Sequence, residues 1–174
     1  MKLLFAALAA IAVLTAMPAV ARPLQCVPYA RAHSDIDLHG NAATWWAKAQ
    51  GLYDRGHRPV TGSVLVFKAT GAMPLGHVAV VDKVVDGRHV ILNHANWSRP
   101  GMIETAAMAE DVSANGDWSR VRVWYAGSRS LGLRENPTFG FIYGPQEEMA
   151  GEPATHDQFD AAFAALPSAG RTDG

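Results

Sequence analysis

Runs of β-branched and apolar residues, separated by turn residues, follow one another along the chain from Gly62 onward. The runs are SVLVFK, HVAVVDKV, HVILNHANW, SRVRVWYA and FGFIY. Short runs of this kind, bounded by Gly, Pro, Asn, Asp and Ser, are typical of β-strands. The pattern therefore predicts that this part of the chain forms a β-sheet.

Two short helices are expected ahead of the sheet. Four residues fall at helical spacing along one face, namely Cys26, Tyr29, Ala30 and His33. This spacing predicts a helix that begins at Gln25 or Cys26 and is ended by the Ser34-Asp35 and His39-Gly40 region. A second helix is predicted over residues 42–50, where Gly51 closes it.

The Asp-Gly pair at residues 86–87 predicts a tight hairpin between the second and third runs, since a type I′ turn needs positive φ at both central positions. Counting back from a two-residue loop places His77 opposite Asn96. The same count places Ala79 opposite His94. Side chains alternate along a strand, so these four residues share one face of the hairpin. We therefore expect His77 to be held by Asn96, by His94 or by both.

The first 21 residues have the pattern of a secretory signal peptide. Lys2 precedes an apolar run over residues 3–17, which is shorter than the roughly 20 residues that a membrane span needs. Ala19 and Ala21 supply the small residues of a cleavage site. We expect cleavage after Ala21, export to the periplasm or out of the cell, and no stable membrane span afterwards. An uncleaved anchor is the alternative.

The chain has 174 residues, 49% of them hydrophobic and 18% charged, which is enough to bury the core of one domain. We place that domain at residues 22–145. Residues 146–174 shift to Ala, Glu, Pro and Gly and are expected to form a low-complexity tail. Within the tail, Thr155 and Gln158 have the spacing of a capping box ahead of FDAAFAAL, which allows a short helix there.

The charge of the chain argues against nucleic acid as a partner. There are 15 Lys and Arg against 16 Asp and Glu, and loss of Lys2 with the leader leaves 14 against 16. No basic stripe or block is available to hold a polyanion. We expect the mature chain to be a monomer.

Cys26 is the single cysteine of the chain, so it cannot form a disulfide within it. Exported proteins usually pair their thiols, and an unpaired thiol needs another explanation. At the start of a helix, free N–H groups and the helix dipole favour the nucleophilic thiolate. We therefore predict that Cys26 is a catalytic nucleophile. The alternatives are a buried structural thiol and a covalent link to another chain.

A cysteine nucleophile needs a base that a third polar group holds in one orientation. His77 fits this role, with His94 and Asn96 beside it on the predicted hairpin. The alternatives are ordinary polar residues that face water, and a zinc site built from Cys26, His77 and His94. No close pair of ligands of the kind found in zinc motifs supports the zinc site, so we assign no metal.

Five stretches of the chain resemble, in their order and spacing, the CHAP domain family of cysteine, histidine-dependent amidohydrolases and peptidases. They are LQCVPYAR, GNAATWWAKAQG, RPVTGSVLVF, GHVAVV and NHANW. The resemblance covers about residues 24–145. It implies a papain-like α+β fold, in which short N-terminal helices pack on an antiparallel β-sheet.

The resemblance also implies roles for individual residues. Cys26 would be the nucleophile, His77 the general base, and Asn96 the family's asparagine. His94 stands where the family commonly has an acidic residue, although related cell-wall cysteine peptidases use a histidine in third place. Whether His94 or Asn96 orients His77 is therefore left open. Gln25 directly precedes the nucleophile and is a candidate second oxyanion donor beside the backbone N–H of Cys26.

Substrate and cofactor expectations come from the resemblance alone. It implies hydrolysis of an amide bond in peptidoglycan, either between sugar and peptide, as in an N-acetylmuramoyl-L-alanine amidase, or within the peptide, as in an endopeptidase. Calcium-binding members carry acidic residues before the cysteine, and residues 22–25 have none, so no cofactor is expected. The alternative is a non-catalytic cell-wall binding or scaffolding module in which His94 marks a lost active site.

Overall fold

The computed structural model describes residues 23–145. The predicted signal peptide and the predicted tail, with its short helix, lie outside the described residues. Within 23–145, no helix has the length and apolar character that crossing a membrane requires.

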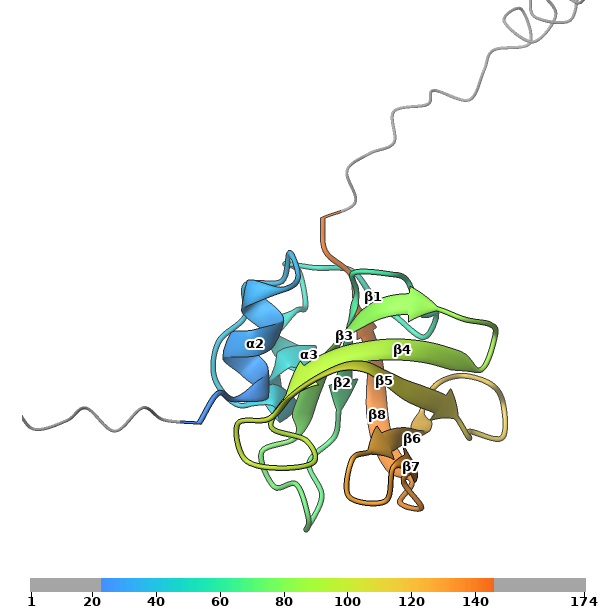
Figure 1. The fold of residues 1–174 in the computed structure, drawn as a ribbon. Coiled ribbons are helices and arrows are strands. Elements are labelled where there is room, and N and C mark those ends of the chain that lie inside the picture. Colours follow the sequence, from blue (N-terminus) through green and yellow to red (C-terminus); the bar gives the residue numbers. More distant parts are fainter. Residues whose placement is uncertain (1–22, 146–174) are drawn as a thin grey trace, which may run out of the picture.

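Two helical segments precede the strands, as the sequence predicted (Figure 1). The helix α2 spans Cys26–Ala32 and begins where the spacing placed it. Pro28 lies in its first turn, where the missing N–H costs nothing. The second segment consists of a 3₁₀ turn, η1 (Ala42–Thr44), that continues into α3 (Trp45–Lys48).

The remaining elements are strands, and every pairing between them is antiparallel. They are β1 (Arg55–Gly56), β2 (Val64–Phe67), β3 (His77–Val84), β4 (His89–Ala95), β5 (Ile103–Asp111), β6 (Arg120–Tyr125), β7 (Ser130–Leu131) and β8 (Asn136–Ile142). The sequence pattern missed β5, because IETAAMAED is rich in Ala and Glu, which strands disfavour.

The prediction of a papain-like α+β fold was wrong. The strand order β8-β2-β3-β4-β5-β6 returns to β8 through a further β6–β8 pairing, in which Val121 faces Asn136. Six antiparallel strands thus form a closed barrel, and strands account for 38% of the structure against 11% for helices. Closure has a physical reason, because a twisted sheet that curls onto itself leaves no unpaired edge. The helices only cover one side of this barrel (Figure 1).

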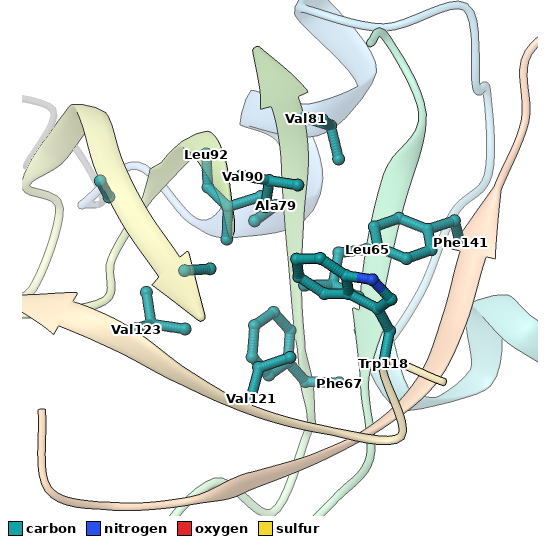
Figure 2. Close-up of a cluster of buried hydrophobic side chains, with 12 residues drawn as sticks. Leu65, Phe67, Ala79, Val81, Val90, Leu92, Trp118, Val121, Val123 and Phe141 are labelled. Atoms are coloured by element: carbon teal, nitrogen blue, oxygen red, sulfur yellow. The ribbon is translucent and has the colours of Figure 1, made fainter. Parts of the chain in front are cut away.

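The barrel has a core on each side of its wall. Twelve buried side chains, contributed by all six barrel strands and the loop before β6, fill the interior (Figure 2). The largest are Phe67, Trp118 and Phe141. On the outer face, Val64 and Val78 belong to a second cluster with residues of the helical segments. Strands β2 and β3 are therefore buried on both faces, which explains their nearly continuous apolar runs.

The hairpin of β3 and β4 has a different turn from the predicted one. The backbone N–H of Val85 donates to the carbonyl of His89 (2.9 Å), so three residues form the loop rather than two. A bulge at Asp82 then shifts the pairing by one residue. Beyond the bulge, Val80 pairs with Asn93, as a two-residue loop would require. The longer loop and the bulge shift the strand pairing in opposite directions. The end of the hairpin away from the turn therefore keeps the predicted register.

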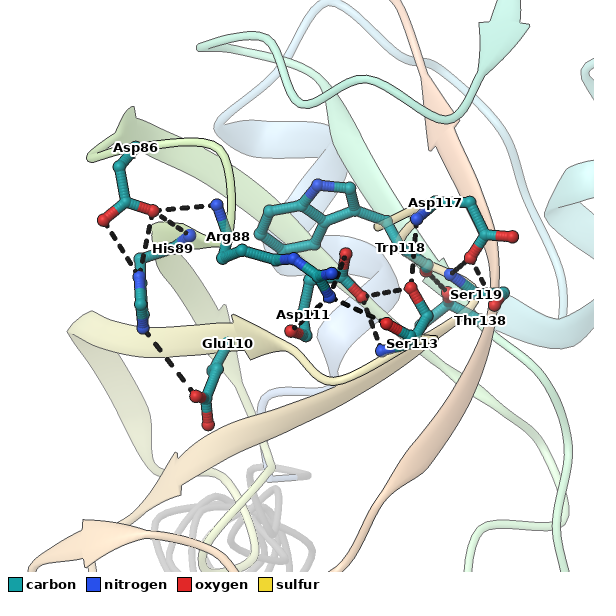
Figure 3. A network of polar contacts seen from close by, with 10 residues as sticks. All are labelled: Asp86, Arg88, His89, Glu110, Asp111, Ser113, Asp117, Trp118, Ser119 and Thr138. Carbon is teal, nitrogen blue, oxygen red and sulfur yellow. Dashed lines mark hydrogen bonds and ion pairs between the residues drawn. The ribbon is translucent and has the colours of Figure 1, made fainter. Parts of the chain in front are cut away.

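A polar network holds the turn end of this hairpin (Figure 3), whereas His77 begins β3 at the other end. Arg88 Nη1 donates to the carbonyl of Ser113 (2.7 Å) and lies 3.4 Å from Asp111 Oδ2. Asp111 is buried, and its other oxygen accepts from the N–H and hydroxyl of Ser113 (2.9 and 2.6 Å). Because its partners compensate the buried carboxylate, this network stabilises the loops at the end of the barrel.

Candidate active site

Cys26 lies at the first position of α2, after Gln25 in extended conformation. Helix α2 packs against β3 and β4, so it brings the thiol to the beginning of β3. There the backbone N–H of Val78 lies near enough to the cysteine sulfur to act on the pKa of the thiol, which it lowers. Cys26 therefore lies beside the strand residue that directly follows His77.

His77 and His94 form a buried pair. Nε2 of His77 and Nδ1 of His94 are 3.0 Å apart, and the two rings meet edge to face with centroids 5.1 Å apart. His77 is 3% exposed and His94 is fully buried. The hydrogen bond leaves Nδ1 as the free ring nitrogen of His77. The structure thus brings together two of the polar residues that the hairpin count had placed on one face.

Trp97 covers this histidine pair and was not singled out as a functional residue by the sequence. Its ring stacks on His94 at a centroid distance of 5.6 Å and lies 4.9 Å from the ring of His77. Its indole N–H donates to the carbonyl of Trp124 (3.1 Å), which fixes the ring. The signal was its place directly after Asn96, where any side chain has to lie near the end of the hairpin.

Burial favours the uncharged forms of both reactive groups. It raises the pKa of the Cys26 thiol, and this effect outweighs the hydrogen bonds from backbone N–H groups that act in the opposite direction. Burial, followed by the neighbouring His94, lowers the pKa of His77 well below its ordinary value of 6.5. The sequence had predicted that the helix start would favour the thiolate. The structure instead favours an uncharged thiol and a neutral imidazole.

Asn96 does not hold His77. It follows the last residue of β4 and adopts a left-handed backbone (φ 64°), a conformation that asparagine tolerates. Its Nδ2 donates to Gln25 Oε1 (2.8 Å), and its Oδ1 accepts from the N–H of Gly101 (2.9 Å). Asn96 therefore clamps the residue before the nucleophile, and among the described residues it is His94 whose side chain forms a hydrogen bond with His77.

Gln25 lies at the mouth of the site, but its side chain is engaged. Its Nε2 donates to the carbonyl of Pro23 (3.1 Å), and its Oε1 accepts from Asn96. One N–H of the carboxamide remains for a ligand. A role of Gln25 in an oxyanion hole stays a prediction.

Glu104 on β5 is a further buried group that the sequence did not reveal. It pairs with His94 across the β4–β5 ladder, and its Oε2 lies 3.8 Å from His94 Nε2. Ser98 donates to both carboxylate oxygens, from its hydroxyl (2.6 Å) and from its backbone N–H (3.0 Å). The missed strand β5 is the reason why Glu104 was missed.

An open cleft of about 850 Å³ lies at this end of the barrel. Cys26, His77, Asn96 and Trp97 all line it. Its rim includes three exposed apolar side chains, those of Leu75, Tyr125 and Leu133. Among the described residues that line the cleft, Arg134 is the only one with a charged side chain of the Asp, Glu, Lys or Arg type. The cleft is therefore apolar at its rim and carries one positive charge.

The donor atoms do not form a metal site. Within residues 23–145, no three His, Cys, Asp or Glu side chains are arranged to hold a metal ion. His77 Nε2 and His94 Nδ1 are hydrogen-bonded to each other, so this pair of nitrogens is not free to bind a metal ion. The geometry instead suits nucleophilic attack by a thiol on a carbonyl carbon, with an oriented imidazole as base.

Comparison with known protein families identifies part of the chain. No curated protein matches the chain, but a family model described as CHAP domain matches residues 18–96. The matched segment runs through α2 and β4 and so includes the cleft residues Cys26, His77 and Asn96. CHAP domains are in general hydrolase domains, and they indicate a peptidoglycan-related amidase or peptidase family. The resemblance seen in the sequence is thereby confirmed, and residues 18–96 of the chain match the CHAP domain family.

Proposed function

We propose that this protein is an exported cysteine hydrolase that cleaves amide bonds in peptidoglycan. The observation that carries the proposal is the convergence, in one cleft, of the Cys26 thiol with a buried histidine that a second histidine orients. A binding module would need the cleft but not this histidine pair. Burying two imidazoles costs stability, and ionisable groups kept in such places are typical of catalytic sites.

The reaction begins with proton transfer from the thiol. His77 takes the proton at Nδ1 while Sγ of Cys26 forms a bond to the amide carbonyl carbon. The tetrahedral intermediate then breaks its C–N bond, and the leaving amine takes the proton from His77. In the second half, His77 removes a proton from water as the oxygen attacks the thioester, and Cys26 is released as the thiol.

The surroundings of the pair support this chemistry. His94 contacts the ring of His77 at Nε2, which leaves Nδ1 free to take the proton of the thiol. Trp97 covers both rings and keeps water from them. The developing negative charge on the carbonyl oxygen would be stabilised by the backbone N–H of Cys26, with the remaining N–H of Gln25 as a second donor.

The cleft suits a peptide that carries carboxylates. Arg134 supplies a positive charge at the cleft, and no ion pair engages its guanidinium within residues 23–145. Arginine binds carboxylates well, because its planar fork matches their geometry. Wall peptides have free carboxylates beside their amide bonds, so Arg134 can pair with one of them. The reaction products will show which amide bond is cleaved, the bond between sugar and peptide or a bond within the peptide.

Export is part of the proposal, because the substrate lies outside the cytoplasm. The leader pattern at residues 1–21, with its small residues at Ala19 and Ala21, supports cleavage and release to the periplasm or beyond the cell.

Incubation of the mature protein with purified peptidoglycan, followed by mass spectrometry of the soluble fragments, tests the function. Release of fragments is expected from the wild type and from His39→Gln, an exposed histidine that does not line the cleft. Cys26→Ala and His77→Gln should release none. The fragment masses identify the bond. If no wild-type preparation releases fragments but the protein sediments with the walls, a binding module replaces the hydrolase.

A further inference from the structure

The histidine pair is asymmetric in its surroundings, and this asymmetry points to a fourth residue of the site. We infer that Glu104 is a positioning residue that sets the proton positions of both histidines, so that Cys26, His77, His94 and Glu104 form one chain. The inference rests on the proposed function for its catalytic meaning. The proton positions themselves can be measured without a substrate.

The hydrogen bond between the histidines admits two proton arrangements, since a neutral imidazole carries one N–H. In the first, His77 Nε2–H donates to His94 Nδ1, and the proton of His94 is on Nε2. In the second, His94 Nδ1–H donates to His77 Nε2, and the proton of His77 is on Nδ1. Only the first arrangement leaves the lone pair of His77 Nδ1 free to accept a proton from the thiol.

The position of Glu104 selects the first arrangement. Within residues 23–145, His94 Nε2 is buried without a hydrogen-bond partner, and Glu104 Oε2 lies 3.8 Å from it. A proton on Nε2 faces the carboxylate and is attracted to it. In the second arrangement a lone pair would face the carboxylate, which repels it in a site with little water.

Glu104 is held in place for this role. It is 6% exposed, and Ser98 donates to both of its oxygens. The hydroxyl of Ser98 in turn accepts from the backbone N–H of Ala126 (2.9 Å), which ties the carboxylate to the loop after β6. On the other side, Trp97 stacks on His94. Among the described residues, Glu104 is therefore the carboxylate that lies within 4 Å of His94 Nε2.

NMR of the full mature chain with ¹⁵N-labelled histidine tests the inference. Long-range ¹H–¹⁵N correlations report which ring nitrogen carries the proton, and spectra of His94→Gln and His77→Gln assign the two residues. The expected result for the wild type is Nε2–H on both His94 and His77. A wild-type His94 with its proton on Nδ1 would overturn the inference, whether or not the protein is a hydrolase.

Substitution of the carboxylate gives the second arm. In Glu104→Gln, the amide can donate to His94 Nε2, so His94 should change to the Nδ1–H form. The rate of Cys26 alkylation by iodoacetamide near neutral pH should then fall by about tenfold, and kcat on peptidoglycan should fall by about ten- to a hundredfold. Glu104→Asp keeps the charge and should keep the Nε2–H form.

Strand β5 offers a matched control. Glu110 also pairs with a histidine across the β4–β5 ladder, and its Oε1 lies 3.9 Å from Nε2 of the partly exposed His89. Glu110→Gln should leave the His94 form, the alkylation rate and kcat unchanged. If Glu104→Gln and Glu110→Gln have equal effects, Glu104 has no positioning role. If the wild type releases no wall fragments but the NMR and alkylation results hold, the proposed function fails and the proton arrangement stands.

Discussion

His94 is an ionisable side chain in a place that disfavours its charge. Burial lowers its pKa from 6.5 to about 4. Between these pH values the unfolded chain binds a proton that the folded chain does not, so acid should destabilise the fold in this interval. The pKa difference corresponds to a loss of at most about 3 kcal/mol in the free energy of unfolding. Glu104, at 3.8 Å, favours the charged form of His94 and so reduces this loss. His77 acts in the same direction.

Urea unfolding at about pH 7 and about pH 4.5 measures this effect. The free energy of unfolding should be lower at the acidic pH, and His94→Gln should show a smaller loss. The carboxylates with lowered pKa values, such as Asp117 at about 2, lose their contribution only below 3.8 and do not interfere. Equal losses in the wild type and in His94→Gln would contradict the prediction.

Single residues were predictable where local rules apply. Cys26 stands out as one unpaired thiol, and His77 and His94 meet because side chains alternate along paired strands. The alternation of side chains did not hold for Asn96. This residue lies after the end of β4, has a positive φ and forms its side-chain hydrogen bond with Gln25. Glu104 could not be found in this way, because its contact with His94 requires the order of strands that were not recognised.

At the scale of elements, the turn before β3 sets the position of the base. Gly76 has φ +68°, and a Cβ on it would lie 2.7 Å from the backbone nitrogen of Ala43 and 2.8 Å from the carbonyl oxygen of Phe67. Gly76→Ala should therefore push β3 away from η1 and β2, move His77, and cost about 2–5 kcal/mol of stability.

Denaturant unfolding measures the loss, and fragment release measures the effect on the site. Gly71→Ala is the matched control, because a Cβ there meets no atom within 4 Å. It should change stability by no more than about 0.5 kcal/mol. A Gly76→Ala protein as stable and active as Gly71→Ala would show that this turn does not position His77.

The hairpin shows why a correct register can come from a wrong turn. The Asp-Gly pair does mark the turn, but the loop has three residues, and the bulge at Asp82 restores the count toward His77. Neither feature has a local signal strong enough to be predicted. Strand β5 was missed because Ala, Met and Glu carry little β preference, and pairing on both sides overrides that preference in the folded chain.

For the whole molecule, closure of the barrel is the property that the sequence did not reveal. The runs predicted strands, but whether a sheet stays open or closes depends on twist and stagger summed over six strands. The closing contact between β6 and β8 is short, and it is supported by Asn136, whose Nδ2 donates to the carbonyl of Val121 (3.3 Å). No single segment carries a signal for such a contact.

The closed barrel leads to a prediction about the limits of the domain. The last barrel strand, β8, ends at Ile142, so all six strands and the described lining of the cleft lie within residues 23–145. A chain of residues 22–145 should therefore unfold at the same temperature as the chain of residues 22–174 and release wall fragments at the same rate. Thermal unfolding followed by circular dichroism, with the fragment assay beside it, compares the two. A melting temperature several degrees lower for the shorter chain would mean that residues 146–174 stabilise the barrel, and an unchanged melting temperature with faster release would mean that they restrict access to the cleft.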